Sequence, residues 1–189
     1  MISFIASFVA GLAGWTLLEY VIHFWLGHLP KGRILISSEH LKHHGDILYF
    51  TPLRLKIQGA VPVLGVLLLI VGGTLGLPAG LGCVGAVALG WSTYEWLHQS
   101  IHVNGPRGAY SRWAARHHLY HHFGHPDSNH GVTTPLWDWV FRTYAPVERV
   151  RVPKRSLASV PWLASAFDVG AEGRAFLADY ELARRDART

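Results

Sequence analysis

The sequence predicts an all-α integral membrane protein, with about three transmembrane helices and a helical cap at one membrane surface. Half of its 189 residues are hydrophobic and 15% are charged, whereas roughly 25% are charged in an ordinary soluble domain. The charges are also segregated, because none precedes Glu19 and none lies between Ile57 and Tyr94. Uncharged apolar runs of about 20 residues are what a membrane-spanning helix requires.

The first expected helix covers residues 2–26 and ends at Gly27, a residue type that commonly follows a helix. Positions five apart do not share a face of an α-helix. We therefore expect His23 and His28 to converge only if the helix stops between them. The N-terminus has no Lys/Arg region and no small-residue cleavage site, so we expect a retained helix rather than a signal peptide.

Residues 57–97 predict a transmembrane hairpin. The stretches 57–77 and 81–97 are apolar and rich in Gly and Ala, which let two helices pack closely in a membrane. Between them, Pro78-Ala79-Gly80 is expected to form the turn. This turn has no Lys or Arg, whereas the flanks of the hairpin are rich in them. The positive-inside rule then predicts a cytoplasmic location for the flanks and the opposite side for the N-terminus.

The composition changes after these segments, and we divide the chain into a membrane domain, residues 1–145, and a basic, amphipathic tail, residues 146–189. The tail is interrupted by prolines, and residues 171–188 are expected to form an amphipathic helix. The side chains expected at the lipid headgroups are Trp162, Leu163 and Phe167. We assign no chemistry to this tail.

The charge distribution argues against a nucleic-acid-binding protein, and the cysteine content argues against a disulfide-stabilised fold. The net charge is +5, but the basic residues flank apolar segments and no recognition motif accompanies them, so the charge indicates a membrane surface and no nucleic acid. The single cysteine, Cys83, has no partner for a disulfide framework.

Histidines occur in four spaced motifs, and imidazole is the commonest metal ligand among side chains. The motifs are H-x4-H at His23 and His28, H-x2-H-H at His40, His43 and His44, H-x3-H at His98 and His102, and H-x2-H-H at His118, His121 and His122. Within a helix, positions i, i+3 and i+4 lie on one face. Because one structural zinc needs only four ligands, these ten donors suit two metal ions, with five ligands each or four each and spares.

Competing explanations fit the pattern less well. A single histidine on an apolar face is more often a core residue with its hydrogen bonds satisfied. That explanation does not account for ten histidines in paired clusters at the membrane edge. A disordered histidine tract is excluded because the motifs are dispersed and lie at helix ends. A carboxylate-bridged di-iron bundle needs two E-x-x-H motifs, and the sequence has one, at Glu95 and His98. We interpret Glu95 and Glu19 as partners that orient imidazoles.

Together these motifs resemble the fatty acid hydroxylase/sterol desaturase superfamily of membrane-bound diiron oxygenases. The resemblance covers Gly11 to Tyr144, including the closing segment from Asn129 to Tyr144. It implies a dimetal centre held by the ten motif histidines, O2-dependent chemistry and a lipid acyl substrate. The sequence is most similar to the fatty acid 2-hydroxylases, which share the H-x4-H spacing and the Gly-Val-Thr and Trp-Asp elements. Arg142 stands where many members have Gly.

An unactivated C–H bond requires a redox metal and oxygen rather than acid–base side chains. We therefore expect two Fe ions and O2 as cosubstrate, a fatty acyl membrane lipid as substrate and a 2-hydroxy acyl product. Zinc can occupy the same nitrogen donors in purified protein. Because no cytochrome b5 domain precedes these motifs, we expect a separate electron donor of the cytochrome b5, ferredoxin or reductase type. The metal site is expected on the cytoplasmic face.

Other functions remain open at this point. A sterol desaturase or a carotenoid hydroxylase would share the site and differ in its groove. A membrane metal transporter would need polar residues along its spans, but residues 57–87 contain only Gln58 and Thr74 as hydrogen-bonding polar side chains. A haem protein would leave most of the histidines unexplained.

Three further histidines, His117, His125 and His130, lie outside the motif spacing. We expect them behind the ligands or at the substrate mouth, where His130 is the strongest candidate. Asn129 is expected to position a water molecule or a ligand.

Overall fold

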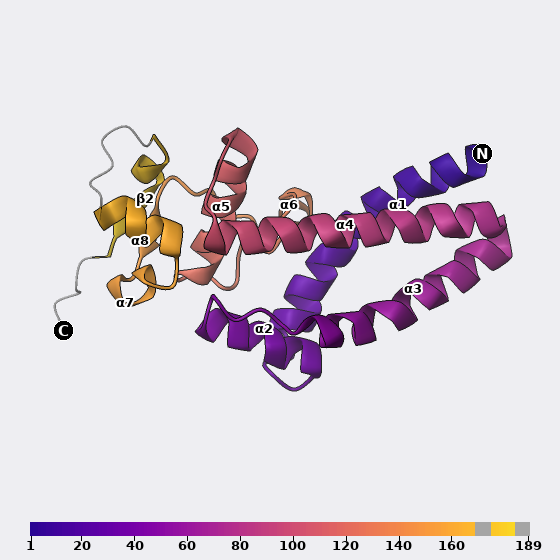
Figure 1. Ribbon diagram of the computed structural model, residues 1–189, viewed down its shortest axis with the longest axis horizontal. Coiled ribbons are helices and arrows are strands. Elements are labelled where there is room, and N and C mark those ends of the chain that lie inside the picture. The colour runs from indigo at the N-terminus through magenta and orange to yellow at the C-terminus, as the bar shows by residue number, and fades with distance from the viewer. Residues whose placement is uncertain (169–174, 184–189) are drawn as a thin grey trace.

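The computed structural model describes residues 1–168 and 175–183, and these residues are mostly helical. Three long helices form one end of the molecule, and the shorter helices gather at the other end (Figure 1). The N-terminus and the turn of a long helical hairpin lie together at the far tip of the long helices. The predicted helical architecture is therefore observed, with one small sheet added to it.

Helix α1 (Ile2–Tyr20) continues without a break into the π-helix η1 (Val21–His28). It packs along α4 (Leu77–Val103) through Trp15, whose side chain is buried. A Cβ atom on Gly90 of α4 would lie only 2.3 Å from the ring of Trp15. Glycine at position 90 therefore makes room for the tryptophan and brings the two helices together.

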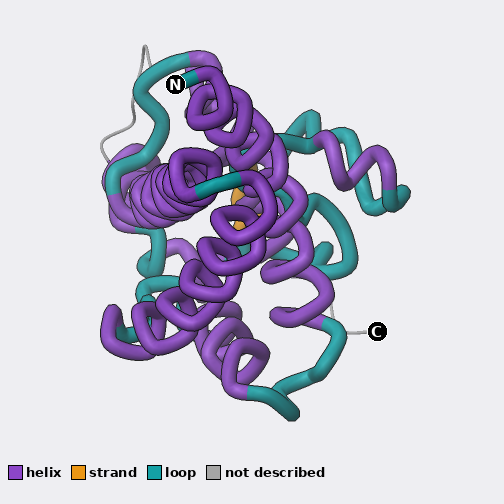
Figure 2. The backbone as a smooth tube through the Cα atoms, turned by 90° about the vertical axis from the view of Figure 1, so that its right-hand side faces the viewer, coloured by secondary structure: helices purple, strands orange, loops and turns teal. Residues whose placement is uncertain are grey.

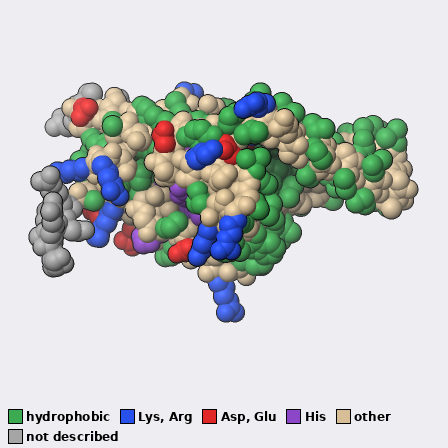
Figure 3. Space-filling view, turned by 90° about the horizontal axis from the view of Figure 1, so that it is seen from below, with side chains coloured by type: hydrophobic (Ala, Val, Ile, Leu, Met, Phe, Trp, Pro, Cys, Tyr) green, Lys and Arg blue, Asp and Glu red, His purple; other side chains and the backbone are tan. Residues whose placement is uncertain are grey.

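Helices α3 (Leu53–Leu75) and α4 form the expected hairpin, but the predicted turn was wrong. The turn lies at Gly76, which has a φ of 90°, and Pro78 belongs to the first turn of α4. Proline is favoured at that position because the first helical N–H groups need no intrahelical acceptor. Two segments, Ile2–His28 and Leu53–Leu75, are long and apolar enough to cross a membrane. Figure 3 shows the corresponding end of the molecule covered by apolar side chains, with the charged groups gathered toward the opposite end.

The opposite end contains α2 (Leu35–Gly45), α5 (Ala109–His122) and the short α6 (Leu136–Val140). Helix α2 packs on η1, and α5 packs on the end of α4. Figure 2, seen from the tip of the long helices, shows helices crossing at differing angles, with a short strand segment behind them. Segments far apart in the sequence therefore converge here.

After the helices, the chain folds back onto α4 and α5. The strands β1 (Val150–Val152) and β2 (Tyr180–Leu182) pair in parallel, and the connecting segment includes α7 (Lys154–Leu157), α8 (Pro161–Asp168) and the 3-10 turn η2 (Ala175–Asp179).

The tail shares the apolar core of α4 and α5. Leu163 is fully buried in that core, and the indole of Trp162 donates to the carbonyl of Ile101 over 2.8 Å. The expectation that Leu163 rests at the lipid headgroups was therefore wrong. The helix predicted for residues 171–188 was also wrong over 175–183, and its remaining residues lie outside the described ones. The division of the chain at residue 145 stays a prediction.

Candidate metal centre

Histidines from four helical segments meet where η1, α2, α4 and α5 converge. They form two groups of five, and within each group the nitrogen atoms that can bind a metal lie within 4.8 Å of one another. Cluster A consists of His23, His28, His40, His44 and His121. Cluster B consists of His43, His98, His102, His118 and His122. The ten histidines of the sequence motifs are thus brought together and divided equally.

The division of the α-helical histidines between the two clusters is consistent with helical spacing. Histidines four residues apart share a cluster in three cases: His40 with His44, His98 with His102, and His118 with His122. The histidine at i+3 in each H-x2-H-H motif, His43 or His121, joins the other cluster. In an α-helix, residues i and i+4 are only about 40° apart, whereas i+3 is displaced by about 60° in the opposite direction. Helices α2 and α5 therefore each contribute to both clusters.

The pair His23 and His28 reaches cluster A by a different route. Both lie in η1, a π-helix, whose hydrogen bonds join residues five apart and so bring such residues onto one face. The predicted helix stop at Gly27 was therefore wrong. Gly27 instead permits the approach of α2, because a Cβ atom there would lie 3.0 Å from Cδ2 of His40.

Four imidazoles of cluster A form a closed square. The distances between neighbouring ring centroids are 4.7 Å for His23–His40, 4.7 Å for His40–His44, 4.8 Å for His44–His121 and 4.7 Å for His121–His23. His28 caps this square, with its centroid 4.5 to 5.4 Å from those of the four others. The five ring centroids thus form a square pyramid with His28 at its apex.

Cluster B repeats this arrangement with different residues. The neighbouring centroid distances are 4.6 Å for His43–His98, 4.7 Å for His98–His118, 4.5 Å for His118–His122 and 4.8 Å for His122–His43. His102 is the cap, 4.7 to 5.0 Å from the four others. The two clusters thus have the same geometry, although their histidines come from different positions in the sequence.

The two squares face each other. Ring contacts between the clusters join members of the squares, and the shortest is the stacked pair His44–His122, at 4.2 Å. Among the described residues, the ring contacts between histidines of different clusters involve neither His28 nor His102. The caps therefore lie on the outer sides, and each square is left uncapped toward its neighbour. An incomplete ligand shell is typical of catalytic metal sites, whereas structural sites are closed.

Backbone carbonyls fix the orientation of three of these rings. The Nδ1 atoms of His23, His43 and His121 donate to the carbonyls of His130, Tyr49 and Ser128, at 2.5, 2.8 and 2.7 Å. Because a carbonyl can only accept, Nδ1 carries the proton and Nε2 keeps its lone pair. In cluster A, Nε2 of His121 lies 3.1 Å from Nε2 of both His28 and His44. Nitrogen lone pairs converging in this way suit a divalent transition metal ion.

Burial keeps these imidazoles neutral. It lowers the pKa of His118, His121 and His122 well below the usual value of 6.5, and that of His44 to about 3. Neighbouring histidines lower the pKa further, because two imidazolium charges repel each other. Neutral imidazoles are the form that binds metal, so the histidine clusters are capable of binding metal ions.

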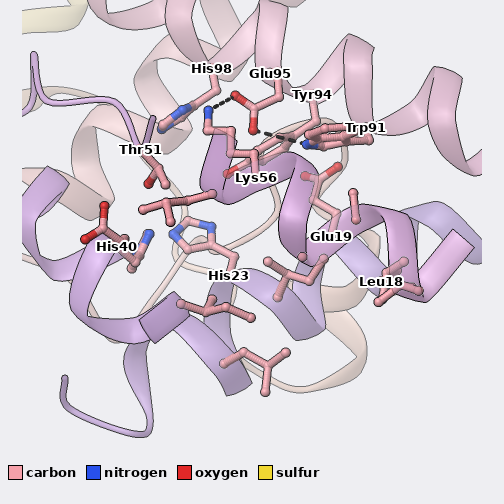
Figure 4. Close-up of a pocket in the computed structure, with 18 of the residues that line it drawn as sticks. Leu18, Glu19, His23, His40, Thr51, Lys56, Trp91, Tyr94, Glu95 and His98 are labelled. Carbon is pink, nitrogen blue, oxygen red and sulfur yellow. Dashed lines mark hydrogen bonds and ion pairs between the residues drawn. The ribbon is translucent and has the colours of Figure 1, made fainter. Parts of the chain in front are cut away.

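A pocket of about 500 Å³ opens beside the clusters, between η1, α2, α3 and α4. Most of its lining is apolar. The histidines that reach it are members of the two squares: His23, His40, His43 and His98. Figure 4 shows His23, His40 and His98 at one side of this pocket, with Leu18 at the far side. Among the described residues, the pocket therefore meets both clusters at members of the squares and not at the caps His28 and His102.

The family model described as fatty acid hydroxylase matches residues 8–143 of the chain. This range contains all ten clustered histidines. The chain belongs to the fatty acid hydroxylase family. The resemblance inferred from the histidine motifs is thus confirmed.

Similar members of this hydroxylase family come from animals and plants. Fatty acid 2-hydroxylase from Macaca fascicularis is 33% identical over 154 residues, which cover 74% of this chain and 39% of the relative. The dihydroceramide fatty acyl 2-hydroxylase FAH2 from Arabidopsis thaliana is 32% identical over 143 residues, covering 70% of this chain and 58% of the relative. The chain thus spans only 39% of the length of the first of these relatives.

A solved structure described as full-length scs7p, with only the hydroxylase domain visible, has the same fold. The TM-score is 0.62 at 26% sequence identity, and the match covers 76% of this chain and 56% of that chain. The overall fold is therefore shared with a hydroxylase domain.

Within this hydroxylase fold, the two glutamates contact groups other than imidazoles. Glu19 accepts hydrogen bonds from the backbone N–H groups of Val132 and Thr133, at 2.6 and 2.8 Å, and from the hydroxyl of Thr133. Glu95 pairs with Lys56 and accepts from the indole of Trp91 at 3.2 Å. Glu19 thus holds the closing segment, whose residue 130 supplies the carbonyl for His23. Direct contact of either carboxylate with an imidazole is not observed among the described residues.

Asn129 serves the closing segment as well. Its side chain donates to the carbonyl of Ala145 at 3.1 Å and accepts from the N–H of Ala145 at 2.8 Å. Its φ of 60° is a left-handed conformation that asparagine tolerates better than most residues. These contacts close a loop and leave Ser128 and His130 positioned to orient His121 and His23.

The remaining three histidines lie outside both clusters. His117 contacts Asp138 at 3.3 Å, and exposed His125 stacks on Tyr120 at 4.0 Å. His130 is fully buried beside cluster A, and its ring centroid lies 5.0 Å from that of His121. His130 is therefore a neighbour of cluster A rather than an exposed mouth residue.

Sequence reasoning missed Asp138. This buried carboxylate accepts from the N–H groups of His130 and Gly131, both at 2.8 Å, and from the hydroxyl of Thr143 at 2.7 Å. It thereby fixes the carbonyl-bearing loop beside cluster A. The available signal was an acidic residue between two tryptophans, Trp137 and Trp139, in an otherwise apolar stretch.

Proposed function

We propose that the protein hydroxylates a lipid acyl chain, at C2 of a fatty acid or a fatty acyl lipid, at two iron ions bound by clusters A and B. The observation that carries this proposal is the junction of the apolar pocket with both clusters, at His23, His40, His43 and His98. A pocket of about 500 Å³ with this lining suits an alkyl chain. The names of the relatives, fatty acid 2-hydroxylase and dihydroceramide fatty acyl 2-hydroxylase, favour the same substrate class.

Clusters A and B would each hold one ion through five imidazoles. When bound, iron supplies the redox chemistry that side chains lack for an unactivated C–H bond. Affinity for nitrogen ligands increases from Fe(II) to Zn(II), so purified protein can carry zinc in the same ligands and be inactive. The absence of a carboxylate from both described clusters separates this centre from the carboxylate-bridged di-iron type.

The reaction needs a source of electrons. Conversion of C–H to C–OH by O2 places one oxygen atom in the product and reduces the other to water, which consumes two electrons and two protons. We propose a separate electron donor, such as a cytochrome b5, a ferredoxin or a reductase. The chain's own residues bind the acyl chain, orient it toward the uncapped squares and exclude water from the apolar pocket.

We propose that α1 with η1, α3 and α4 all cross the membrane, and that the clusters lie at its cytoplasmic face. Two of these segments meet the length and hydropathy of a span. The third, α4, is the antiparallel partner of α3 in the hairpin. The uncharged hairpin turn and the basic flanks support this orientation by the positive-inside rule.

The test is lipid analysis by mass spectrometry of a host that expresses the protein, together with assays of iron-reconstituted protein supplied with O2 and a reductant. We expect 2-hydroxy acyl lipids with the native chain and none with His121→Ala, because cluster A then loses a ligand. His125→Ala is the matched control, since His125 is exposed and lies outside both clusters. A hydroxylated sterol or carotenoid would reassign the substrate, and no hydroxylated product at all would refute the proposal.

A further inference from the structure

The pocket also holds a charged pair that the clusters do not account for. Among the described residues that line it, Lys56 is the one Lys or Arg, and it pairs with Glu95 across the α3–α4 hairpin. The two side chains are 20% and 28% exposed, so the pair is largely withdrawn from solvent. A partly buried charge pair in an apolar pocket is costly unless it has further polar contacts.

The other acidic residues of the pocket already have several polar partners. Glu19 binds the closing segment through Val132 and Thr133. Glu39 contacts Lys42 and Tyr49. Lys56 differs from them, because an ammonium has three N–H groups and Glu95 is the acceptor that it contacts within the described residues. Lys56 therefore retains donors for an oxygen atom of a bound molecule.

The position of the pair relative to the clusters is specific. Glu95 precedes His98 of cluster B by one helical turn, and Figure 4 shows Lys56, Glu95 and His98 side by side at the rim of the pocket. The apolar lining continues away from this rim, past Val63 and Val87. An acyl chain with its carbonyl oxygen at Lys56 would place its first carbons nearest the histidines and its methyl end toward the membrane.

We propose that Lys56, held in place by Glu95, binds the carbonyl oxygen of the acyl substrate and thereby determines which carbon faces the clusters. This inference rests on the proposed hydroxylase function and adds the residue that sets the position of hydroxylation. Because Glu95 already balances the charge of Lys56, the pair suits a neutral carbonyl such as an amide or ester. A free carboxylate would compete with Glu95 for the same ammonium.

The first test is Lys56→Met, which keeps an apolar stem of similar length and removes the donors. With an N-acyl amide lipid as substrate, we expect KM to rise about 10- to 100-fold, the effect of losing a hydrogen bond to a charged group. We also expect hydroxyl groups to appear at carbons beyond C2, measured by mass spectrometry of the products. Arg54→Met is the control, because Arg54 is an exposed cation on the same helix outside the pocket lining.

The second test separates substrate binding from a purely structural link between α3 and α4. The double variant Lys56→Glu, Glu95→Lys keeps an ion pair but moves the cation to the other helix. Under the proposal, its products remain spread over several carbons while its metal content and melting temperature match the native protein. Recovery of the native KM and of hydroxylation at C2 in the double variant would overturn the proposal, as would an unchanged product pattern in Lys56→Met. If the native chain itself yields no hydroxylated lipid, the proposed function fails instead.

Discussion

At the scale of single residues, Gly27 shows how a missing side chain shapes the metal centre. Its Cα faces the ring of His40, and a Cβ atom would lie 3.0 Å from Cδ2 and 3.1 Å from Cγ of that ring. We predict that Gly27→Ala displaces His40 and weakens metal binding at cluster A by about 10-fold or more, as loss of ligand orientation does elsewhere. Metal content measured against a graded chelator tests this.

Gly14→Ala is the matched control for Gly27→Ala. Gly14 lies in α1, and a Cβ atom on it would meet nothing within 4 Å. Both variants gain helix propensity from alanine, so they differ in the contacts of the added Cβ atom, which at position 27 meets the ring of His40 and the carbonyl oxygen of Ile22 at 3.2 Å. Equal metal retention by the two variants would show that the approach of His40 does not depend on glycine.

Arg142 is a second residue at which the backbone conformation matters, because a non-glycine residue occupies a position with a positive φ. The family resemblance implies Gly at this position, and the φ of Arg142, 60°, lies in the left-handed region that favours Gly. That conformation costs a non-glycine residue about 1 kcal/mol or more. The closing segment holds it there, because Thr143 and Tyr144 both donate backbone N–H groups to the carbonyl of Asp138, at 2.8 and 3.1 Å.

At the scale of elements, α2 shows how one helix can serve two metal ions. His43 belongs to cluster B and His44 to cluster A, although they are adjacent in sequence. We predict that His43→Ala and His44→Ala each lose one of two bound ions, that the double variant loses both, and that His125→Ala loses neither. Metal-to-protein ratios, with cobalt spectra to identify the site that remains, measure this. Loss of both ions from either single variant would mean that the two clusters bind metal as one unit.

The helical motifs were predictable because their spacing follows from α-helix geometry, as His40/His44 and His98/His102 illustrate. The route of His23 and His28 was not, because a π-helix has no simple sequence signal and the α-helical rule then places them on different faces. The same limit applied to the division of each H-x2-H-H motif between clusters. That division depends on where α2 and α5 lie relative to each other, which is a property of tertiary packing.

At the scale of the whole molecule, the parts that escaped prediction are those fixed by distant partners. The tail was expected to lie on the membrane, but Leu163 is buried and Val150 pairs with Tyr180 in a small sheet. Arg112 of α5 binds Asp179, with Nη2 and Oδ1 2.8 Å apart, and so ties the sheet to the helices. Amphipathic composition alone does not distinguish a surface that meets lipid from one that meets protein.

The clusters join helical segments that make few other contacts with one another, so metal binding should stabilise the whole fold. Each cluster draws ligands from three segments: cluster A from η1, α2 and α5, and cluster B from α2, α4 and α5. An ion present at 100 times its dissociation constant stabilises the folded state by about 2.7 kcal/mol. We therefore predict that removing both ions with a chelator lowers the melting temperature in detergent by about 10 °C or more.

The loss of stability on metal removal should be greatest in one part of the fold. Hydrogen exchange should accelerate most in α2, which contributes three ligands and otherwise packs mainly on η1, whereas the α3–α4 hairpin should change least because its helices pack on each other. The double variant His43→Ala, His44→Ala is the control, since it lacks a ligand in each cluster and should not respond to chelator. A melting temperature unaffected by chelation in the native protein, with metal loss verified, would mean that the helices hold the imidazoles in place without the ions.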